Sequence, residues 1–249
     1  MGETIQPTEL LFSTDAYLRE FDAEVVAVDE AVSGLALSAT AFFPGGGGQP
    51  HDTGELRMEN SDARVEKVSK GERGLIWHAL AAGTPVPEVG TLVRGVLDWE
   101  RRHRIMRTHT AQHVLNGIVW LDHGAHVTSA HMSDGEGRLD FELPAMSQDL
   151  RRELEIRVNE VVRRDLPVRV VFLPRAEADS DPSLMRLRAD LIPRSVDPLR
   201  VIDIIGFDRQ ADGGTHVAST GEIGRVHITK VQSKGRANKR VRIAIEDRL

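Results

Sequence analysis

The sequence predicts an α+β protein in which a small β-barrel at the N-terminus is followed by an α+β domain with helices packed on an antiparallel sheet. Three observations support this fold class. Short runs of alternating apolar and polar residues fill the stretch from about Ala23 to Leu97, two segments of helical periodicity follow, and strand-like runs then return toward the C-terminus. We therefore expect two domains, residues 1–97 and residues 98–249.

The alternating runs of the first half are separated by clusters of Gly, Pro, Asn and Asp, which favour turns. Residues 63–68 (Ala-Arg-Val-Glu-Lys-Val) and 74–78 (Gly-Leu-Ile-Trp-His) are two such runs, and Lys70-Gly71-Glu72 is the expected turn between them. Several short strands in succession are typical of a small barrel.

Two helices are expected in the second half. The first covers about Glu100 to Leu121. The second runs from Ser147, a residue type that can cap a helix, to Arg164. Its apolar residues recur on one face: Leu150, Leu154, Val158, Val161 and Val162. The strands expected after it are 168–172, 200–205, 224–231 and 240–245, and a looser, acidic, Pro-containing stretch covers 175–198.

The composition is that of a globular chain with a sizeable core, because 40% of its 249 residues are hydrophobic. The chain shows no charged-then-apolar N-terminal signal, no apolar run long enough to cross a bilayer and no cysteine. These features argue against a disulfide-dependent secreted fold, and we expect a soluble, cytoplasmic protein. The net charge of −6 argues against a general nucleic-acid coat.

Basic residues nevertheless gather in two places. The segment from Arg225 to Ile245 holds seven Lys and Arg residues and no acid, which favours either a strip that contacts phosphates or a solvated strand face. The candidate phosphate-binding residues there are Lys230, Lys234, Arg236, Lys239, Arg240 and Arg242. A second patch begins the first predicted helix, where it would contact phosphate or form surface salt bridges. It consists of Arg101, Arg102, Arg104 and Arg107.

Four consecutive glycines, Gly45 to Gly48, stand between Pro44 and Gln49-Pro50. The run lacks the Gly-Lys-Ser/Thr of a P-loop and does not open a helix, so ATP and dinucleotide binding are not expected. Bare glycines let backbone amides approach a ligand closely, whereas a flexible surface turn is the alternative explanation.

His109 and His113 lie four residues apart in a segment predicted to be helical, so their imidazoles share one helix face and can converge on a metal ion. Downstream, Asp212-Gly-Gly-Thr-His216 offers a carboxylate and a third imidazole. Together they predict a zinc site, although a His pair at this spacing also arises by chance in a chain with ten histidines. Thr110 stands where a zinc protease carries its general-base glutamate, so a protease is not expected.

These motifs resemble those of the alanyl-tRNA editing proteins of the AlaX type and of the editing domain of alanyl-tRNA synthetase. The matching segments follow the family's order and span nearly the whole chain. They are Thr40 to Gly54 around the glycine run, Asp98 to Arg107, His109-Thr-Ala-Gln-His113, Asp212-Gly-Gly-Thr-His216-Val217, Thr220-Gly-Glu-Ile-Gly224 and Ser233-Lys234-Gly235. Two residues depart from the family pattern: Asp212 replaces a zinc-ligating cysteine, and Phe43 replaces a tyrosine.

The resemblance implies a metal-dependent aminoacyl-tRNA deacylase with one Zn²⁺ per chain, held by His109, His113, Asp212 and His216. Its substrate would be alanine tRNA that carries serine or, as a second substrate, glycine. Because carboxylate is a harder ligand than thiolate, Asp212 leaves the identity and affinity of the metal open.

The resemblance also implies which residues face the substrate and the tRNA. Thr40 and Gln49 match the family's substrate-facing residues, and Thr40 is the candidate that tests for the serine hydroxyl. Ordinary packing in a strand is the alternative role of Thr40. The residues expected to contact tRNA are Arg102, Arg107, Lys234, Arg236, Lys239 and Arg240.

Two other classes of function remain compatible with the sequence. The chain could be a non-catalytic tRNA- or metal-binding module in which Asp212 marks a decayed site. It could also be a metal hydrolase that acts on small esters or amides. The chain is short and has no activation-domain motif, so we expect it to act in trans on tRNA charged elsewhere.

Overall fold

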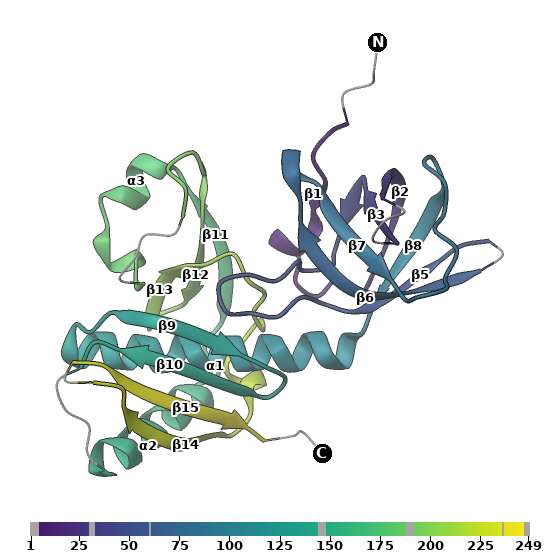
Figure 1. The fold of residues 1–249 in the computed structure, drawn as a ribbon. Helices are drawn as coiled ribbons and strands as arrows, with labels where there is room; N and C mark the ends of the chain where they lie inside the picture. The colour runs from purple at the N-terminus through teal and green to yellow at the C-terminus, as the bar shows by residue number, and fades with distance from the viewer. Residues whose placement is uncertain are drawn as a thin grey trace. The chain divides into compact units, whose positions relative to one another are not determined.

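Figure 1 shows the fold of the computed structural model, which describes residues 5–29, 33–59, 61–143, 148–187, 192–235 and 237–246. The chain divides into two compact units, Met1–His103 and Arg104–Leu249. Within the described residues, a closed antiparallel barrel, further antiparallel sheets and three α-helices confirm the predicted α+β class. In the part of the chain that the structure describes, no helix is long and apolar enough to cross a membrane.

The first unit is built around a closed barrel of antiparallel strands in the order β2-β3-β7-β6-β5-β8, which confirms the predicted small barrel. These strands are β2 (Glu20–Asp29), β3 (Gly34–Leu37), β5 (Gly54–Arg57), β6 (Asp62–Lys70), β7 (Ile76–Leu80) and β8 (Leu92–Leu97). Two short strands pair in parallel, β1 (Glu9–Leu10) and β4 (Ala39–Thr40), and 3-10 turns lie at Leu11–Ser13 and Glu72–Gly74.

The packing of the barrel explains why the alternation in the sequence is imperfect. In β6, Val65 and Val68 are both buried although they lie three positions apart, whereas strict alternation would bury residues two or four apart. The pairing of β6 with β7 shifts register between Val65 and Lys67, and such a bulge adds one residue so that Val68 returns to the interior. In β8, a Cβ on Gly95 would lie 2.3 Å from the ring of Phe21, so this position requires glycine.

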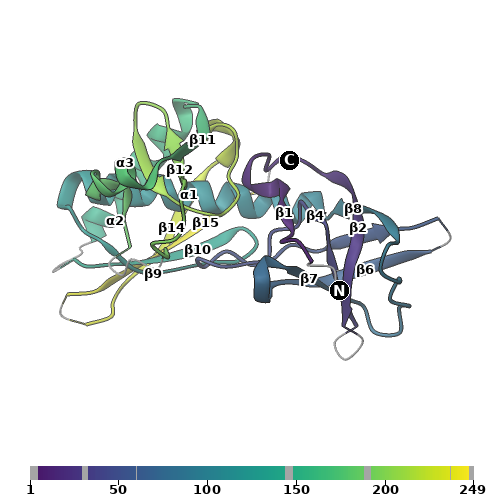
Figure 2. The ribbon, with the colours of Figure 1, turned by 90° about the horizontal axis from the view of Figure 1, so that it is seen from above.

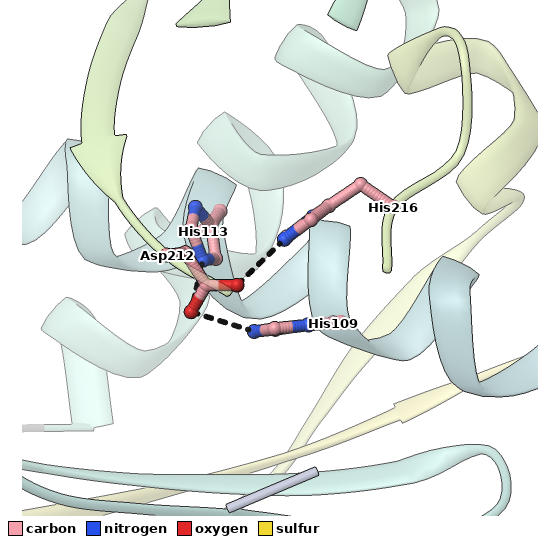
Figure 3. Close-up of side chains that lie close together, drawn as sticks. All are labelled: His109, His113, Asp212 and His216. Atoms are coloured by element: carbon pink, nitrogen blue, oxygen red, sulfur yellow. Dashed lines mark hydrogen bonds and ion pairs between the residues drawn. The ribbon is translucent and has the colours of Figure 1, made fainter. Parts of the chain in front are cut away.

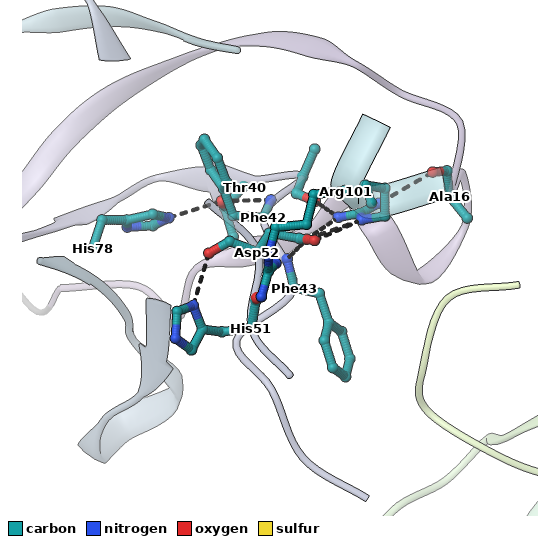
Figure 4. Close-up of polar contacts among 10 residues, drawn as sticks. Ala16, Thr40, Phe42, Phe43, His51, Asp52, His78 and Arg101 are labelled. Atoms are coloured by element: carbon teal, nitrogen blue, oxygen red, sulfur yellow. Dashed lines mark hydrogen bonds and ion pairs between the residues drawn. The ribbon is translucent and has the colours of Figure 1, made fainter. Parts of the chain in front are cut away.

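A buried ion pair fixes the glycine-rich segment within the first unit. Arg102, on the first turn of α1 (Trp99–His123), is fully buried, and its Nε donates to the two oxygens of Asp52 at 3.0 and 2.9 Å. Its guanidinium also donates to the carbonyl oxygens of Ala16 and Ala41, at 3.1 and 2.5 Å. Asp52 in turn accepts a hydrogen bond from Phe43 N–H at 2.6 Å (Figure 4). Breaking such a buried pair typically costs about 3–5 kcal/mol.

The second unit holds two antiparallel sheets, with strand orders β14-β15-β10-β9 and β11-β12-β13. The first sheet contains β9 (Val127–Met132), β10 (Glu136–Phe141), β14 (Val226–Ser233) and β15 (Lys239–Ile245). The second contains β11 (Val168–Leu173), β12 (Leu199–Ile204) and β13 (Asp208–Ala211). The remaining elements are α2 (Gln148–Arg163), α3 (Arg175–Asp179) and 3-10 turns at Pro182–Leu184 and Thr220–Ile223.

Figure 2 shows the two long helices beside the strands of the four-stranded sheet. Side chains of both helices bond the backbone of these strands. From α1, Gln112 Nε2 donates to the carbonyl oxygens of His131 and Arg138, at 3.0 and 3.1 Å. From α2, Asn159 both donates to the carbonyl of Val226 at 2.7 Å and accepts its N–H at 3.0 Å. The predicted packing of helices on an antiparallel sheet is therefore confirmed.

In the second unit, the main difference between structure and prediction is that three strands were not predicted. Both long helices are confirmed, with ends shifted by one or two residues, and Ser147, the predicted cap of α2, lies outside the described residues. Strands β9, β10 and β13 were not predicted. The stretch 175–198, predicted as loose, contains α3, the 3-10 turn at Pro182–Leu184 and part of a small core. That core consists of Leu173, Ala178, Leu184, Leu199 and Val201.

Candidate metal centre

Four potential metal ligands come together in the second unit (Figure 3). His109 and His113 project from one face of α1, one turn apart, whereas Asp212 and His216 come from the loop that follows β13. Their ligand atoms all lie within 4.8 Å of one another. The convergence expected from the sequence is therefore present, and metal binding itself stays a prediction.

The distances within the cluster fit a shared ion. Asp212 Oδ2 lies 3.6 Å from His109 Nε2 and 3.8 Å from His113 Nε2, and Asp212 Oδ1 lies 3.3 Å from His216 Nε2. The two longer separations exceed hydrogen-bond length. Donors that lie about 2.0–2.1 Å from a tetrahedral zinc ion are about 3.4 Å from one another. The donor types and their spacing thus fit a four-coordinate divalent ion.

The Asp212 carboxylate is held by its own turn and by the neighbouring strand. Gly214 N–H donates to Asp212 Oδ1 at 2.6 Å, an Asx-turn contact that aims the side chain. Arg200 Nη1 donates to the carbonyl oxygen of Asp212 at 2.8 Å, and Asp212 N–H donates to that of Arg200 at 3.2 Å. Arg200 was not predicted from the sequence. The register of β12 with β13 places it beside Asp212, so recognition of that hairpin would have found it.

Burial sets the charge of the cluster. Desolvation lowers the pKa of His109 to about 4 and that of His216 well below its ordinary value, so both rings are neutral at pH 7. Burial alone would raise the pKa of Asp212, but the facing rings of His109, His113 and His216 outweigh it and hold this pKa well below its usual range. Neutral imidazoles and an ionised carboxylate are the forms that bind a metal.

Two of the imidazoles have hydrogen-bond partners beyond the cluster, as metal-binding histidines usually do. The ring of His109 hydrogen-bonds the backbone of Thr215. Thr110, which follows His109 in the sequence, is fully buried. Its Oγ1 lies 3.1 Å from His216 Nδ1 and accepts a hydrogen bond from Val217 N–H at 3.2 Å. These contacts join residues more than a hundred positions apart, and no local signal in the sequence indicates them.

The glycine-rich loop belongs to the first unit and adopts a backbone that glycine favours. Gly45 to Gly48 all have positive φ, between 60° and 134°. Gly46 and Gln49 exchange two backbone hydrogen bonds of 3.0 and 2.9 Å, and Gln49 is buried. The approach of this loop to a ligand stays a prediction.

Thr40 has no exposed surface, and its hydroxyl is engaged twice. Its Oγ1 lies 2.9 Å from His78 Nε2 and accepts from Phe42 N–H at 3.1 Å (Figure 4). These contacts give Thr40 a role in holding the chain that leads into the loop, and its contact with a substrate hydroxyl stays a prediction. Phe43, which replaces the family's tyrosine, is buried edge-to-face against Phe12 with ring centroids 5.3 Å apart.

The basic residues at the start of α1 form hydrogen bonds and ion pairs with other residues of the unit to which each belongs. Arg101 Nη1 donates to the carbonyl of His51 at 2.6 Å, and Arg102 forms the ion pair described above. Arg107 is buried, and its Nε donates to the carbonyl of Ile223 at 2.9 Å. Contacts of Arg102 and Arg107 with phosphate stay predictions.

The basic segment near the C-terminus is partly exposed and partly built into the sheet. Arg240 donates through two nitrogens to the carboxylate of Asp140, at 2.7 Å each. Lys239 is buried, whereas Lys234 is exposed. Arg236 lies outside the described residues. The tRNA contacts expected of this segment stay predictions.

Comparison with known proteins places the chain among domains shared by tRNA synthetases and editing proteins. Residues 199–242 match the threonyl and alanyl tRNA synthetase second additional domain, and residues 12–101 match class II (A) tRNA synthetases. The alanyl-tRNA editing proteins AlaX-M of Saccharolobus solfataricus and Methanosarcina acetivorans are 38% and 37% identical, over 94% and 96% of this chain and 97% and 100% of their own lengths. The chain belongs to this AlaX-M family. The alanine–tRNA ligase of Korarchaeum cryptofilum is also 38% identical over 91% of the chain, which spans 25% of that protein.

Proposed function

We propose that this chain hydrolyses the ester bond between a wrongly attached amino acid and the 3′ end of alanine tRNA, acting in trans on tRNA charged by another enzyme. The observation that carries the proposal is the cluster of three imidazoles and one carboxylate, in a chain that matches alanyl-tRNA editing proteins over nearly their full length. The first unit would supply the glycine-rich loop and the second the deacylase site. A tRNA substrate places the reaction in the cytoplasm.

His109, His113, Asp212 and His216 would hold one divalent ion, with zinc as the first candidate. When bound there, a zinc ion would polarise a carbonyl or lower the pKa of a water toward neutrality. The neutral rings of His109 and His216 offer lone pairs, the carboxylate adds a negative charge, and Arg200 keeps the backbone of Asp212 in place. A carboxylate in place of a thiolate also makes harder divalent ions relatively better competitors for the site.

The proposed substrates are Ser-tRNA(Ala) and Gly-tRNA(Ala), with correctly charged Ala-tRNA(Ala) spared. A site discriminates serine from alanine most effectively with a buried polar group that hydrogen-bonds the serine hydroxyl. The same group is left without a partner when alanine is bound. Thr40 and Gln49 are the proposed substrate-facing residues. A hydroxyl can make three hydrogen bonds, and that of Thr40 already has two partners, so one position remains for a serine hydroxyl.

The tRNA backbone is proposed to contact the basic hairpin formed by β14 and β15. Lys234, Arg236, Lys239 and Arg240 are the candidates from the sequence, and the exposed Lys230 and Arg242 extend the same surface. Phosphate contacts of this kind position the tRNA without reading its sequence. For Arg102 and Arg107, which the sequence indicated as further phosphate contacts, both side chains are buried and bonded internally, so a contact with tRNA there would require those bonds to open.

The test of the reaction is deacylation of alanine tRNA charged with serine, glycine or alanine, by wild type and by His113→Ala. We expect rapid loss of serine and glycine, slow loss of alanine, and background rates for the variant. A wild type no faster than His113→Ala on every substrate would make the chain a non-catalytic tRNA- or metal-binding module. Equal or faster hydrolysis of small esters or amides, with no preference for charged tRNA, would point to a small-molecule hydrolase.

The role of Thr40 is tested in the same assay by Thr40→Val. If Thr40 bonds the serine hydroxyl, the preference for serine over alanine should fall by about 0.5–1.5 kcal/mol, the usual worth of one such bond, while glycine clearance changes less. If Thr40 only supports the loop through His78 and Phe42, the variant loses stability and the ratio of serine to alanine clearance is unchanged.

A further inference from the structure

We propose that Thr110 is a positioning residue of the metal site: it accepts a hydrogen bond from His216 Nδ1–H and thereby presents His216 Nε2 as a ligand. The inference rests on the metal site proposed above. Thr110 lies within the His109-Thr-Ala-Gln-His113 motif, at the position where a zinc protease carries glutamate. Its side chain is fully buried and hydrogen-bonded to residues of the loop that supplies the other two ligands.

The hydrogen-bond capacity of the Thr110 hydroxyl determines which way each bond runs. A hydroxyl donates once and accepts twice. The carbonyl oxygen of Met106, one turn earlier in α1, lies 2.9 Å away and can only accept, so the hydroxyl proton points to it. Val217 N–H uses one lone pair at 3.2 Å. His216 Nδ1, at 3.1 Å, therefore donates to the second lone pair.

Because His216 Nδ1 donates this hydrogen bond, the tautomer of the His216 ring is determined. A neutral imidazole has one N–H, so a proton held on Nδ1 leaves a free lone pair on Nε2. It is Nε2 that lies 3.3 Å from Asp212 Oδ1 and faces the other ligand atoms. Because Val217 follows His216 directly, one oxygen on α1 fixes both the ring and the backbone of this part of the loop.

Thr108 provides a matched control on the same helix. It is also fully buried, and its hydroxyl donates to the carbonyl oxygen of Arg104, four residues earlier, at 2.9 Å. Thr108→Val therefore removes the same kind of side-chain-to-helix bond as Thr110→Val, and it leaves the contact between Thr110 and His216 in place. Thr110→Ser keeps the hydroxyl and is the conservative rescue.

The experiment measures zinc affinity by chelator competition for wild type, Thr110→Val, Thr110→Ser and Thr108→Val, and follows the His216 Nδ1–H proton by NMR in the zinc-loaded proteins. We expect Thr110→Val to bind zinc about 10–100-fold more weakly and to lose the protected Nδ1–H signal. Thr110→Ser and Thr108→Val should keep the signal and bind zinc within a few-fold of wild type. A purely structural role of Thr110 would lower thermal stability without a selective change in zinc affinity or in this proton.

Thr110→Val that binds zinc as tightly as Thr108→Val would overturn the proposal and leave the metal site intact. A wild type that binds no zinc would overturn the metal site and this inference together, so the two failures are distinguishable. The wild type also tests the proposal without any variant. Rapid exchange of the His216 Nδ1–H proton with solvent in the zinc-loaded protein would contradict a buried bond to Thr110.

Discussion

Asp212 stands where the resembled family pattern has a cysteine, and the structure shows how its carboxylate is held. Gly214 N–H fixes one carboxylate oxygen, and the other faces the two histidines of α1. A carboxylate binds zinc as a hard oxygen ligand, whereas the soft thiolate of cysteine matches zinc better. The replacement therefore affects the strength and selectivity of the proposed site more than its geometry.

We expect Asp212→Cys to retain or tighten zinc binding and His109→Ala to abolish it, because the first change substitutes a softer ligand and the second removes one. Elemental analysis of the purified proteins after zinc is supplied should give one ion per chain for wild type and Asp212→Cys, and none for His109→Ala. A cysteine variant with much weaker zinc binding would show that position 212 is not in the coordination shell.

The burial of His78 leads to a separate prediction, which concerns how the free energy of unfolding depends on pH. His78 is fully buried, and burial lowers its pKa from 6.5 to about 4. Between these values the unfolded chain binds the proton and the folded chain does not, so the free energy of unfolding falls as the pH drops from 6.5 toward 4 and is unaffected above 6.5. From pH 7 to pH 5, wild type should lose about 2 kcal/mol more than His78→Gln.

Urea unfolding of wild type and His78→Gln at the two pH values measures this difference, because the other titrating groups contribute equally to both proteins. The glutamine keeps a hydrogen-bonding side chain beside Thr40 but cannot titrate. The same loss of stability in both proteins would show that His78 accepts its proton without penalty in the folded state.

At the scale of elements, the basic hairpin of β14 and β15 contains two kinds of basic residue. Some are exposed and available to contact tRNA, and others bond groups within the sheet. Lys230, Lys234 and Arg242 are exposed, whereas Arg240 bonds the carboxylate of Asp140. Alanine at the three exposed positions should weaken tRNA binding about equally for all tRNA sequences. It should also flatten the dependence of log affinity on log salt by about 0.7–0.9 for each phosphate that is no longer neutralised.

Filter binding or fluorescence anisotropy at several salt concentrations measures both quantities. Arg240→Ala is a poor substitute for this set, because it also leaves a buried carboxylate without its partner. Unchanged affinity and salt slope in the triple variant would identify the hairpin as a solvated face.

The elements that were predicted from the sequence are those whose signal is local. Helices α1 and α2 follow from periodicity, and the barrel follows from repeated short alternation. Strand β9 was missed because its residues do not alternate in burial. Strand β10 contains Gly137, where a Cβ would lie 2.7 Å from Gln112 of α1. Glycine weakens a strand signal, and here its purpose is close packing of a helix on the sheet.

At the scale of the whole molecule, the candidate site joins two chain segments about a hundred residues apart. The His109-to-His113 spacing and the motif around His216 were combined into one predicted zinc site from their ligand types, and the family resemblance supported that combination. The structure adds what the motifs lack, namely the contacts of Thr110 and Arg200 that hold the loop against α1 and β12. The contacts of Thr110 depend on tertiary packing, so no pattern within either segment predicts them, whereas the hairpin of β12 and β13, had it been recognised, would have placed Arg200 beside Asp212.

All four proposed ligands lie in the unit Arg104–Leu249, so metal binding should stabilise the two units unequally. A ligand that binds only the folded state stabilises it by about 2.7 kcal/mol at a free concentration 100 times its Kd. We expect zinc to slow hydrogen exchange of amides around the site, in the C-terminal part of α1 and in β12, and to leave β6 and β7 of the barrel unchanged. His109→Ala with and without zinc is the control. Equal slowing in both units, or any slowing in the variant, would mean that zinc acts elsewhere or that the chain unfolds as one cooperative body.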